Sequence, residues 1–483
     1  MSERPSVLVI GAGFGGLGAA IALRRAGYTE VTVLERADDV GGVWRDNTYP
    51  GAACDVPSPL YSWSFAPNPR WGRRYAGHAD ILDYIRRTAE ESGVRGRVRT
   101  GVEATAATWD EGAGRWRVDT STGEVFEAEV LVPAVGQLSR PVVPDLPGTE
   151  AFGGPAFHSA EWRHDVDLAG SRVAVVGTGA SAIQFVPGIV DRVGSMTVFQ
   201  RSAAYVVPKP DRAYTALHHA AYSRFPVVQR VGRATTWFLS ERLNQALTEG
   251  SPLTRGLELA FRTLLRRQVR DPGKRRKLVP DYPIGCKRML FSNDWFRALD
   301  RDHVTLVDEP VTEVLPHGVR SADGTEHPAD VLIWGTGFAA TEFLGPLKIT
   351  GPGGVELHDV WGEEPRAHLG MTVPGFPNLF LLYGPNTNLG GSSIIGMLEA
   401  QAGYVVQAVQ ALADGRFDRL EVRPEVADRY DEEIQTRLAD TVWAGCGSWY
   451  RSPAGRITTN WPGLVAEYQQ RTARLDPGDF TGG

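Results

Sequence analysis

Two glycine-rich turns, far apart in the chain, most constrain what this sequence can fold into. The first is Gly11-Ala-Gly-Phe-Gly-Gly16 and the second is Gly177-Thr-Gly-Ala-Ser-Ala182, and each follows a short apolar run, Ser6–Ile10 or Arg172–Val176. Glycine permits a tight strand-to-helix turn and a close approach of backbone N–H groups to a pyrophosphate, and the following helix N-terminus favours negative charge. The sequence therefore predicts an α/β fold with two Rossmann-like dinucleotide-binding domains. The glycines expected to contact the nucleotides are Gly11, Gly13, Gly16, Gly177 and Gly179.

The residue at the end of the next apolar run distinguishes the two ligands. Glu35 and Arg201 stand at the same distance from the first glycine of their respective turns. A carboxylate there hydrogen-bonds ribose hydroxyls and repels a 2'-phosphate, whereas a guanidinium binds the phosphate through paired hydrogen bonds. Glu35 therefore indicates FAD, and Arg201 indicates NADPH. The alternative is that either turn is only a tight connection between a strand and a helix.

Length and composition are those of an ordinary multidomain globular protein. The chain has 483 residues, of which 42% are hydrophobic and 22% charged. A single core rarely grows beyond about 250 to 300 residues, so we expect two or three domains. The net charge of -6 offers no attraction to nucleic acid. The first apolar run begins at Ser6 without a signal peptide before it, and no run reaches the roughly 18 residues of a membrane span, so we expect a cytoplasmic protein.

The cysteines argue against one class of flavoprotein. Cys54, Cys286 and Cys446 are widely spaced and form no C-x-x-C pair, as we expect of a reducing compartment. Flavoprotein disulfide reductases share a layout with two nucleotides but require a redox dithiol, which this chain is expected to lack. The sequence also has no spacing of histidines, cysteines or carboxylates that suggests a metal, and no G-x-S-x-G motif of a hydrolase.

The order of the segments predicts that the second nucleotide domain is inserted in the first. A linker with prolines spaced through Arg140–Gly148 separates the two units, and apolar runs ending in glycine recur near residues 330–338 and 378–385. Residues of about 211–280 have the apolar spacing of helices, and the basic run within them is interpreted as a solvated helix face, with contact to an acidic partner or a membrane as the alternative. The expected domains are an FAD domain (1–140, returning at 331–483 with a C-terminal segment) and an NADPH domain (141–330) with a helical insert (about 211–280).

Two longer patterns point to a particular family. Gly41-Gly-Val-Trp44, Tyr49-Pro-Gly51 and Asp55 match G-G-x-W-x-x-x-x-[FY]-P-G-x-x-x-D, and Phe152 to Trp162 match F-x-G-x-x-x-H-x-x-x-W between the two nucleotide turns. In these patterns the chain resembles the type I Baeyer-Villiger monooxygenases. The resemblance extends through Cys286-Lys-Arg288 to the C-terminal segment, although Arg163 follows the tryptophan where the family often has proline.

The resemblance implies roles for individual residues. Arg288 matches the active-site arginine of the family, and Asp55 is expected to be the carboxylate that orients it. Lys287 is expected to reach the NADPH phosphate together with Arg201. His158, in the connection between domains, is interpreted as coupling domain movement and not as a proton carrier. The further residues expected to contact cofactors are Gly42, Trp44, Ser181 and Gln184, with a helix cap as the alternative for Ser181.

The predicted reaction uses NADPH and O2 to insert one oxygen atom next to a ketone carbonyl, giving an ester or lactone. The resemblance implies a peroxide carried by the flavin, which a fixed cation such as Arg288 would keep deprotonated. Two alternatives remain: a flavin-dependent oxygenase of sulfur or nitrogen, which needs a protonated peroxide, and a flavoprotein similar to an NADPH oxidase or a redox sensor. The expected partners are therefore small molecules, a ketone and O2.

Overall fold

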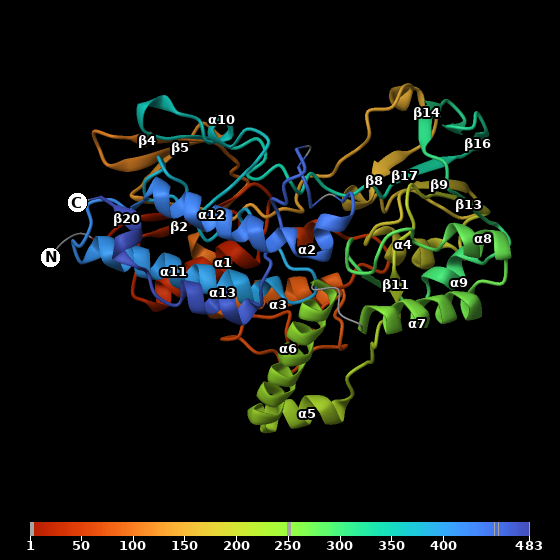
Figure 1. The fold of residues 1–483 in the computed structure, drawn as a ribbon, viewed down its shortest axis with the longest axis horizontal. Coiled ribbons are helices and arrows are strands. Elements are labelled where there is room, and N and C mark those ends of the chain that lie inside the picture. Colours follow the sequence, from red (N-terminus) through yellow and green to blue (C-terminus); the bar gives the residue numbers. More distant parts are fainter. Residues whose placement is uncertain (1–3, 249–252, 449, 453, 483) are drawn as a thin grey trace.

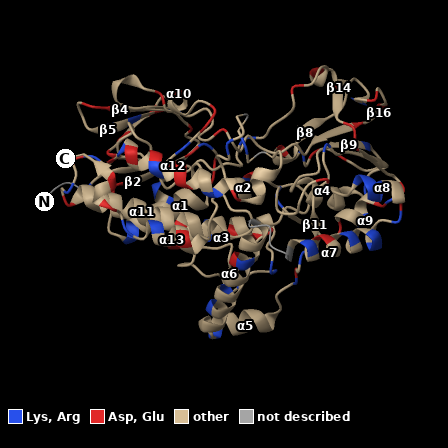
Figure 2. Cartoon of the chain, viewed as in Figure 1, with Lys and Arg blue, Asp and Glu red and all other residues tan. Residues whose placement is uncertain are grey.

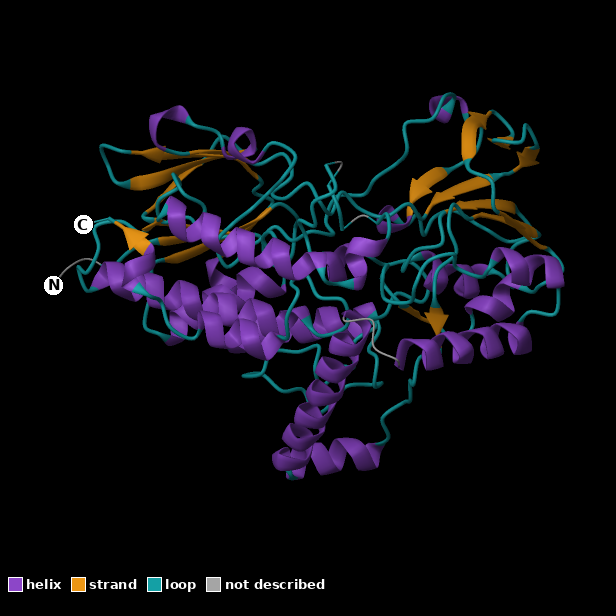
Figure 3. Cartoon of the chain, viewed as in Figure 1, coloured by secondary structure: helices purple, strands orange, loops and turns teal. Residues whose placement is uncertain are grey.

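The computed structural model describes residues 4–248, 253–448, 450–452 and 454–482, so Trp449 of the C-terminal segment lies outside it. The chain forms two lobes, and both chain ends lie at the outer end of the same lobe (Figure 1). Helices cover strands in both lobes (Figure 3). The predicted α/β fold is confirmed.

The first lobe is built on a parallel sheet with the strand order β3-β2-β1-β7. Its strands are β1 (Val7–Ile10), β2 (Val31–Glu35), β3 (Val98–Thr100) and β7 (Val130–Pro133). Every residue of β1 and β7 is buried, as expected of a parallel sheet covered on both faces. Helix α1 (Phe14–Arg25) starts directly after the first glycine turn. The first predicted strand-turn-helix unit is therefore present.

The second lobe repeats this arrangement with five parallel strands in the order β13-β10-β9-β17-β8. The strands are β8 (Ala156–His158), β9 (Arg172–Val176), β10 (Ser195–Phe199), β13 (Val304–Val307) and β17 (Val331–Trp334). Helix α4 (Ala182–Ile189) follows the second glycine turn. The run expected to end this sheet, 303–307, contains its edge strand β13.

The return of the chain to the first lobe comes later than we expected. We assigned residues from 331 onward to the first domain, but β17 pairs with β9 from Val331↔Val173 to Trp334↔Val176 and belongs to the second sheet. The chain returns to the first lobe at Lys348–Thr350, which pair with Ala106–Thr108, and it reaches the first sheet near Phe380, whose N–H donates to Leu131 O at 3.0 Å. An isolated apolar run predicts a buried strand but does not show which sheet the strand joins. The sequence therefore offered no basis for assigning Val331–Trp334 to the second sheet.

Helix α11 (Ile394–Ala413) fixes this return, because it shares a hydrophobic core with α1. Its N-cap is Ser393, where the sequence predicted the helix to begin. The remaining helices of the first lobe are α2 (Val43–Asp46), α3 (His78–Glu91), α10 (Leu357–Trp361), α12 (Pro424–Ala439) and α13 (Val465–Thr472). The C-terminal segment thus packs against the first nucleotide unit.

Smaller sheets complete both lobes. One has the order β18-β4-β5-β6 and comprises Lys348–Thr350, Ala104–Asp110, Arg115–Thr120 and Val125–Ala128. Another has the order β14-β15-β16 and comprises Val311–Leu315, Gly318–Ser321 and Glu326–Pro328. Two short pairs are β11-β12 (Val206–Val207 and Leu290–Phe291) and β19-β20 (Glu421–Val422 and Phe480–Thr481).

The region expected to be helical contains α5 (Ala216–Arg224), α6 (Pro226–Thr248), α7 (Leu253–Gln268) and α8 (Pro272–Lys277), and α9 (Trp295–Leu299) follows it. Phe261 and Leu265 of α7 are buried in the core of the second lobe. Helices α5 and α6 instead form an arm that projects at one side of the molecule, while one face of α6 is hydrogen-bonded to the first lobe (Figure 1). Among the described residues, no helix is long and apolar enough to cross a membrane.

Candidate active site

The first glycine turn is so tight that two of its positions require glycine. Gly11 has φ = +104°, and a Cβ built on it would stand 2.6 Å from Ala134 O. A Cβ on Gly16 would stand 1.8 Å from Gly11 O, so this position also requires glycine. Gly13 is the N-cap residue of α1 and makes no side-chain cap. The turn therefore presents the backbone N–H groups of a helix N-terminus, as a bound pyrophosphate requires.

Glu35 lies beside this turn at the end of β2. Its carboxylate accepts hydrogen bonds from Ala12 N at 2.8 Å and from Ala37 N at 3.0 Å, and it pairs with Arg45 Nη1 at 3.1 Å. The side chain is almost completely buried. These contacts fix the carboxylate at the position from which a ribose is recognised in this type of fold.

The Gly-Gly-x-Trp segment packs against the same turn. A Cβ on Gly42, where φ is +54°, would stand 3.2 Å from Gly13 Cα. Trp44 Nε1 donates a hydrogen bond to Tyr61 Oη at 3.1 Å. Two sequence patterns that are separate in the chain thus form one surface around the first nucleotide turn.

The second glycine turn has the same construction. A Cβ on Gly177, where φ is +112°, would stand 2.3 Å from Gly335 O, and Gly179 follows it in the turn. Ser181 is the N-cap residue of α4, but its side chain makes no capping hydrogen bond. The cap role considered for Ser181 is therefore absent, and its contact with a cofactor stays a prediction.

Arg201 and Lys287 gather near the end of β10. Arg201 is exposed, and it forms neither a hydrogen bond nor an ion pair with the described part of the chain. Lys287 Nζ lies 3.3 Å from the hydroxyl of Ser202, the neighbour of Arg201, and 4.5 Å from the ring centre of Tyr282. The two cations therefore come from distant segments to one edge of the second sheet.

Gln184 makes contacts that the sequence did not predict. Its Nε2 donates to Ala53 O at 3.0 Å, and its Oε1 accepts from Ala53 N at 3.1 Å and from Tyr49 Oη at 3.3 Å. Helix α4 of the second lobe thereby holds the loop of the first lobe that carries Asp55. A cofactor contact for Gln184 stays a prediction beside this structural role.

Arg288 and Asp55 meet between the lobes, as the resemblance implied. Arg288 Nη2 donates to Asp55 Oδ2 at 2.6 Å, and Arg288 Nε lies 3.3 Å from the same oxygen. Burial alone would raise the pKa of Asp55, but the charge of Arg288 outweighs it and holds this pKa below its usual value. In turn, attraction to Asp55 raises the pKa of Arg288. Both groups therefore stay charged over the working pH range.

A small pocket opens beside this pair. It is lined by Lys287, Arg288, Met289, Gly390, Trp443 and Tyr450, among others. Burial raises the pKa of Tyr450 to about 12, so its phenol is neutral. Residues of both lobes and of the C-terminal segment thus enclose the guanidinium.

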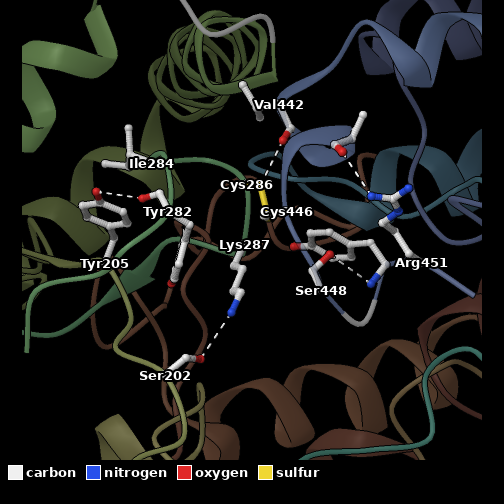
Figure 4. Close-up of a disulfide and its surroundings, with 12 residues drawn as sticks. Ser202, Tyr205, Tyr282, Ile284, Cys286, Lys287, Val442, Cys446, Ser448 and Arg451 are labelled. Carbon is white, nitrogen blue, oxygen red and sulfur yellow. Dashed lines mark hydrogen bonds between the residues drawn. A yellow bond between two sulfur atoms is a disulfide. The ribbon is translucent and has the colours of Figure 1, made fainter. Parts of the chain in front are cut away.

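The cysteines contradict the sequence-based expectation. Cys286 and Cys446, 160 residues apart, form a disulfide with a Cα–Cα distance of 6.2 Å, whereas Cys54 is free and buried. Figure 4 shows that the bridge joins the segment of Lys287 to the C-terminal loop. Spacing in the sequence could not reveal this pairing because the fold alone brings the two positions together.

His158 ends β8 and is almost completely buried. Its Nδ1 accepts a hydrogen bond from Ala160 N at 3.1 Å, and burial lowers its pKa. The ring packs edge-on against Phe338. A neutral, packed imidazole agrees with a structural interpretation and not with proton transfer to a substrate.

Tyr383 is a residue of the site that sequence reasoning missed. It has φ = +61°, which is unusual for a residue with a side chain. Its hydroxyl donates to Asn388 Oδ1 at 2.7 Å, its N–H donates to Gln401 Oε1 at 3.0 Å, and its carbonyl accepts from Gln137 Nε2 at 3.0 Å. The Tyr-Gly-Pro sequence after an apolar run was the only available signal. This network holds the loop that connects the buried run before Tyr383 to helix α11.

Two glycine turns, one beside a buried carboxylate and one beside an exposed arginine, define an oxidoreductase of the two-dinucleotide type. Among the described residues, no group of histidines, cysteines and carboxylates could hold a metal ion. Residues 8–218 match the family model described as pyridine nucleotide-disulphide oxidoreductase. The class therefore follows from both the geometry and the comparison.

Comparisons over the full chain identify the family. A Baeyer-Villiger monooxygenase of Streptomyces coelicolor is 43% identical over 99% of this chain and 92% of that protein. Another, of Pseudomonas aeruginosa, is 39% identical over 97% of this chain and 90% of that protein. The fold is similar to that of a steroid monooxygenase bound to NADP (TM-score 0.85, 30% identity, 97% of both chains). It is also similar to OTEMO in complex with FAD and NADP (TM-score 0.89, 28% identity, 99% of both chains). The chain belongs to the Baeyer-Villiger monooxygenase family, and it is a flavin-dependent monooxygenase.

Proposed function

We propose that Arg288, oriented by Asp55, is the catalytic cation of an NADPH- and O2-dependent conversion of ketones to esters or lactones. The observation that carries this proposal is the 2.6 Å contact between Arg288 Nη2 and Asp55 Oδ2 beside the pocket between the lobes. The first lobe holds FAD and the second, inserted lobe holds NADPH. The small-molecule partners are a ketone and O2.

The residues present fit both cofactors. The turn at Gly11 requires glycine, because a Cβ there would collide with Ala134 O, and a turn without side chains lets backbone N–H groups approach a pyrophosphate. Glu35 supports recognition of a ribose of FAD, and Arg201 with Lys287 supports recognition of the 2'-phosphate of NADPH. When bound, the flavin takes a hydride from NADPH and activates O2.

Arg288 then controls the protonation state and the charge of the reacting oxygen atoms. A guanidinium does not lose its proton at working pH, so it favours the deprotonated form of an oxygen nucleophile beside it. It also stabilises negative charge that develops on the carbonyl oxygen of a ketone. Asp55 keeps the guanidinium in one orientation, so the cation is in place before the reaction.

Oxidation of sulfur or nitrogen is the less favoured activity. Such reactions need a protonated, electrophilic oxygen, and a fixed cation stabilises the deprotonated form. The measured preference between a ketone and a sulfide of similar size therefore tests the role of the guanidinium directly.

The experiment is a comparison of Arg288→Ala with the unchanged enzyme on linear, cyclic and aromatic ketones. Loss of one preorganised charge donor costs on the order of 3 to 4 kcal/mol, so ester formation is expected to fall several hundredfold or more. Arg172→Ala, which removes an exposed arginine that is also paired with an aspartate, is the matched control. Unchanged ester formation in Arg288→Ala, or only hydrogen peroxide from the unchanged enzyme with every ketone, refutes the proposal.

A further inference from the structure

The arm formed by α5 and α6 is attached to the body along one face of α6. Gln229 Nε2 donates to Asn68 O at 2.6 Å, and Arg233 Nη1 donates to Ser62 O at 3.0 Å. Positions 229 and 233 are one helical turn apart and therefore lie on the same side of α6. Glu241, two turns further on, is also buried. The opposite side of α6 consequently faces away from the protein.

That outward side is apolar. Val227 is 61% exposed, Val231 60% and Phe238 52%, and their spacing of four and seven residues puts them on one face of the helix. Leu217 of α5 is 77% exposed, and Phe225 between the two helices is 54% exposed. Contiguous exposed apolar groups of this kind mark an interaction surface more often than isolated ones do.

The arm is also basic. Residues 216–248 contain four arginines and a single carboxylate, the buried Glu241, although the whole chain has a net charge of -6. Arg224 and Arg230 are exposed and form no ion pair within the described ranges. The Arg242 guanidinium lies 5.1 Å from the ring centre of Phe238, next to the apolar face. Figure 2 shows basic residues, drawn in blue, along this arm.

We propose that the arm docks the enzyme onto the surface of a bilayer that contains anionic phospholipids. An apolar helix face flanked by arginines enters the boundary between headgroups and acyl chains, while the guanidinium groups bind lipid phosphates. The rest of the protein carries the excess of negative charge and is repelled by such a surface, so the arm approaches first.

A second copy of the chain fits this surface less well. The exposed part of the arm carries Arg224 and Arg230 and no exposed carboxylate, because its one glutamate, Glu241, is buried against the body, so two arms in contact would offer each other only positive charge. Like charges in contact are unfavourable at an interface. A phospholipid surface instead offers negative charge at every point.

Flotation of the full-length FAD-loaded enzyme with vesicles tests the proposal. We expect binding to vesicles of equal parts phosphatidylcholine and phosphatidylglycerol, weaker binding to phosphatidylcholine alone, and loss of binding at high salt. Arg224→Gln with Arg230→Gln is expected to lower the partition coefficient about thirtyfold, at about fivefold for each arginine. Val227→Ser with Val231→Ser is expected to lower it about tenfold or more.

Matched controls separate docking by the arm from general attraction. Arg266→Gln with Arg267→Gln removes the same charge from exposed positions of α7, and Val355→Ser with Val360→Ser removes exposed valines of the first lobe. Both controls are expected to bind like the unchanged enzyme. The proposal is overturned if the enzyme does not bind anionic vesicles, or if the controls lose as much binding as the arm variants. It is also overturned if the enzyme without lipid is a dimer that the arm variants dissociate.

Discussion

Asp55→Asn is expected to slow ketone oxygenation while leaving the fold intact. The variant keeps the size of the side chain and an oxygen that can accept from Arg288, but it removes the charge. A hydrogen bond to a charged group contributes about 1.5 to 3 kcal/mol. Because the side chains of Arg288 and Asp55 are 35% and 22% exposed, solvent screening favours the lower part of this range. We therefore expect kcat for the ester to fall about tenfold to thirtyfold.

The assay measures ester, hydrogen peroxide and NADPH consumption together at saturating ketone. Loss of orientation at Arg288 should divert NADPH oxidation from ester to hydrogen peroxide, which a purely structural defect would not do selectively. Asp330→Asn is the matched control, because Asp330 accepts from Arg172 Nη2 at 2.6 Å far from the pocket. This control should leave the ratio of ester to peroxide unchanged.

A double-mutant cycle decides whether Asp55 acts through the guanidinium. If it does, Asp55→Asn should have little further effect on the ester rate in an Arg288→Ala background, because the oriented group is already absent. Equal effects of Asp55→Asn in both backgrounds would refute the reasoning, since Asp55 would then act independently of Arg288.

Three further predictions follow from the structure. Arg201→Ala should raise KM about tenfold or more for NADPH but hardly for NADH, and equal changes would contradict the phosphate contact. His368 has its pKa lowered from 6.5 to about 4 by burial and by nearby arginines, so its neutral form stabilises the fold above pH 6.5. The free energy of unfolding should therefore fall by up to about 3 kcal/mol between pH 6.5 and 4, and His368→Phe should abolish this part of the fall in thermal scans. Cys286→Ser should lower the free energy of unfolding by up to about 5 kcal/mol, because the disulfide closes a loop of 160 residues. Added dithiothreitol should lower Tm in the unchanged enzyme but not in this variant. Cys54→Ala, at a cysteine outside the disulfide, is the control.

The sequence predicted the local units well because each has a local physical cause. Gly11 and Gly177 occupy backbone conformations with positive φ, and in both turns a side chain would collide with a neighbouring carbonyl. Such requirements can be recognised from the residue types alone. The pairing of Asp55 with Arg288 is different, because 233 residues separate them and only the resemblance to a family connected them.

What the sequence could not predict depends on contacts between distant segments. The strand Val331–Trp334 has the same apolar composition whichever sheet it joins, and only its pairing with β9 decides its place. The bond between Cys286 and Cys446 likewise depends on the C-terminal segment folding back over the site. Gln184 was expected at the nucleotide because it lies in the second turn, yet its amide holds the loop of Asp55.

The Gln184 contact shows how the two nucleotide units are connected at the catalytic pair. Asp55 belongs to a loop of the first lobe, and the neighbouring Ala53 is held through both its N–H and its carbonyl by helix α4 of the second. Arg288 comes from the second lobe, and the disulfide at Cys286 ties its segment to the C-terminal loop packed on the first. Each partner of the ion pair is therefore restrained by the lobe opposite to its own. If one lobe moves relative to the other, either the Gln184 contact and the disulfide segment move together with it, or the distance between the guanidinium and the carboxylate changes. The orientation of Arg288 therefore depends on how the two lobes are arranged.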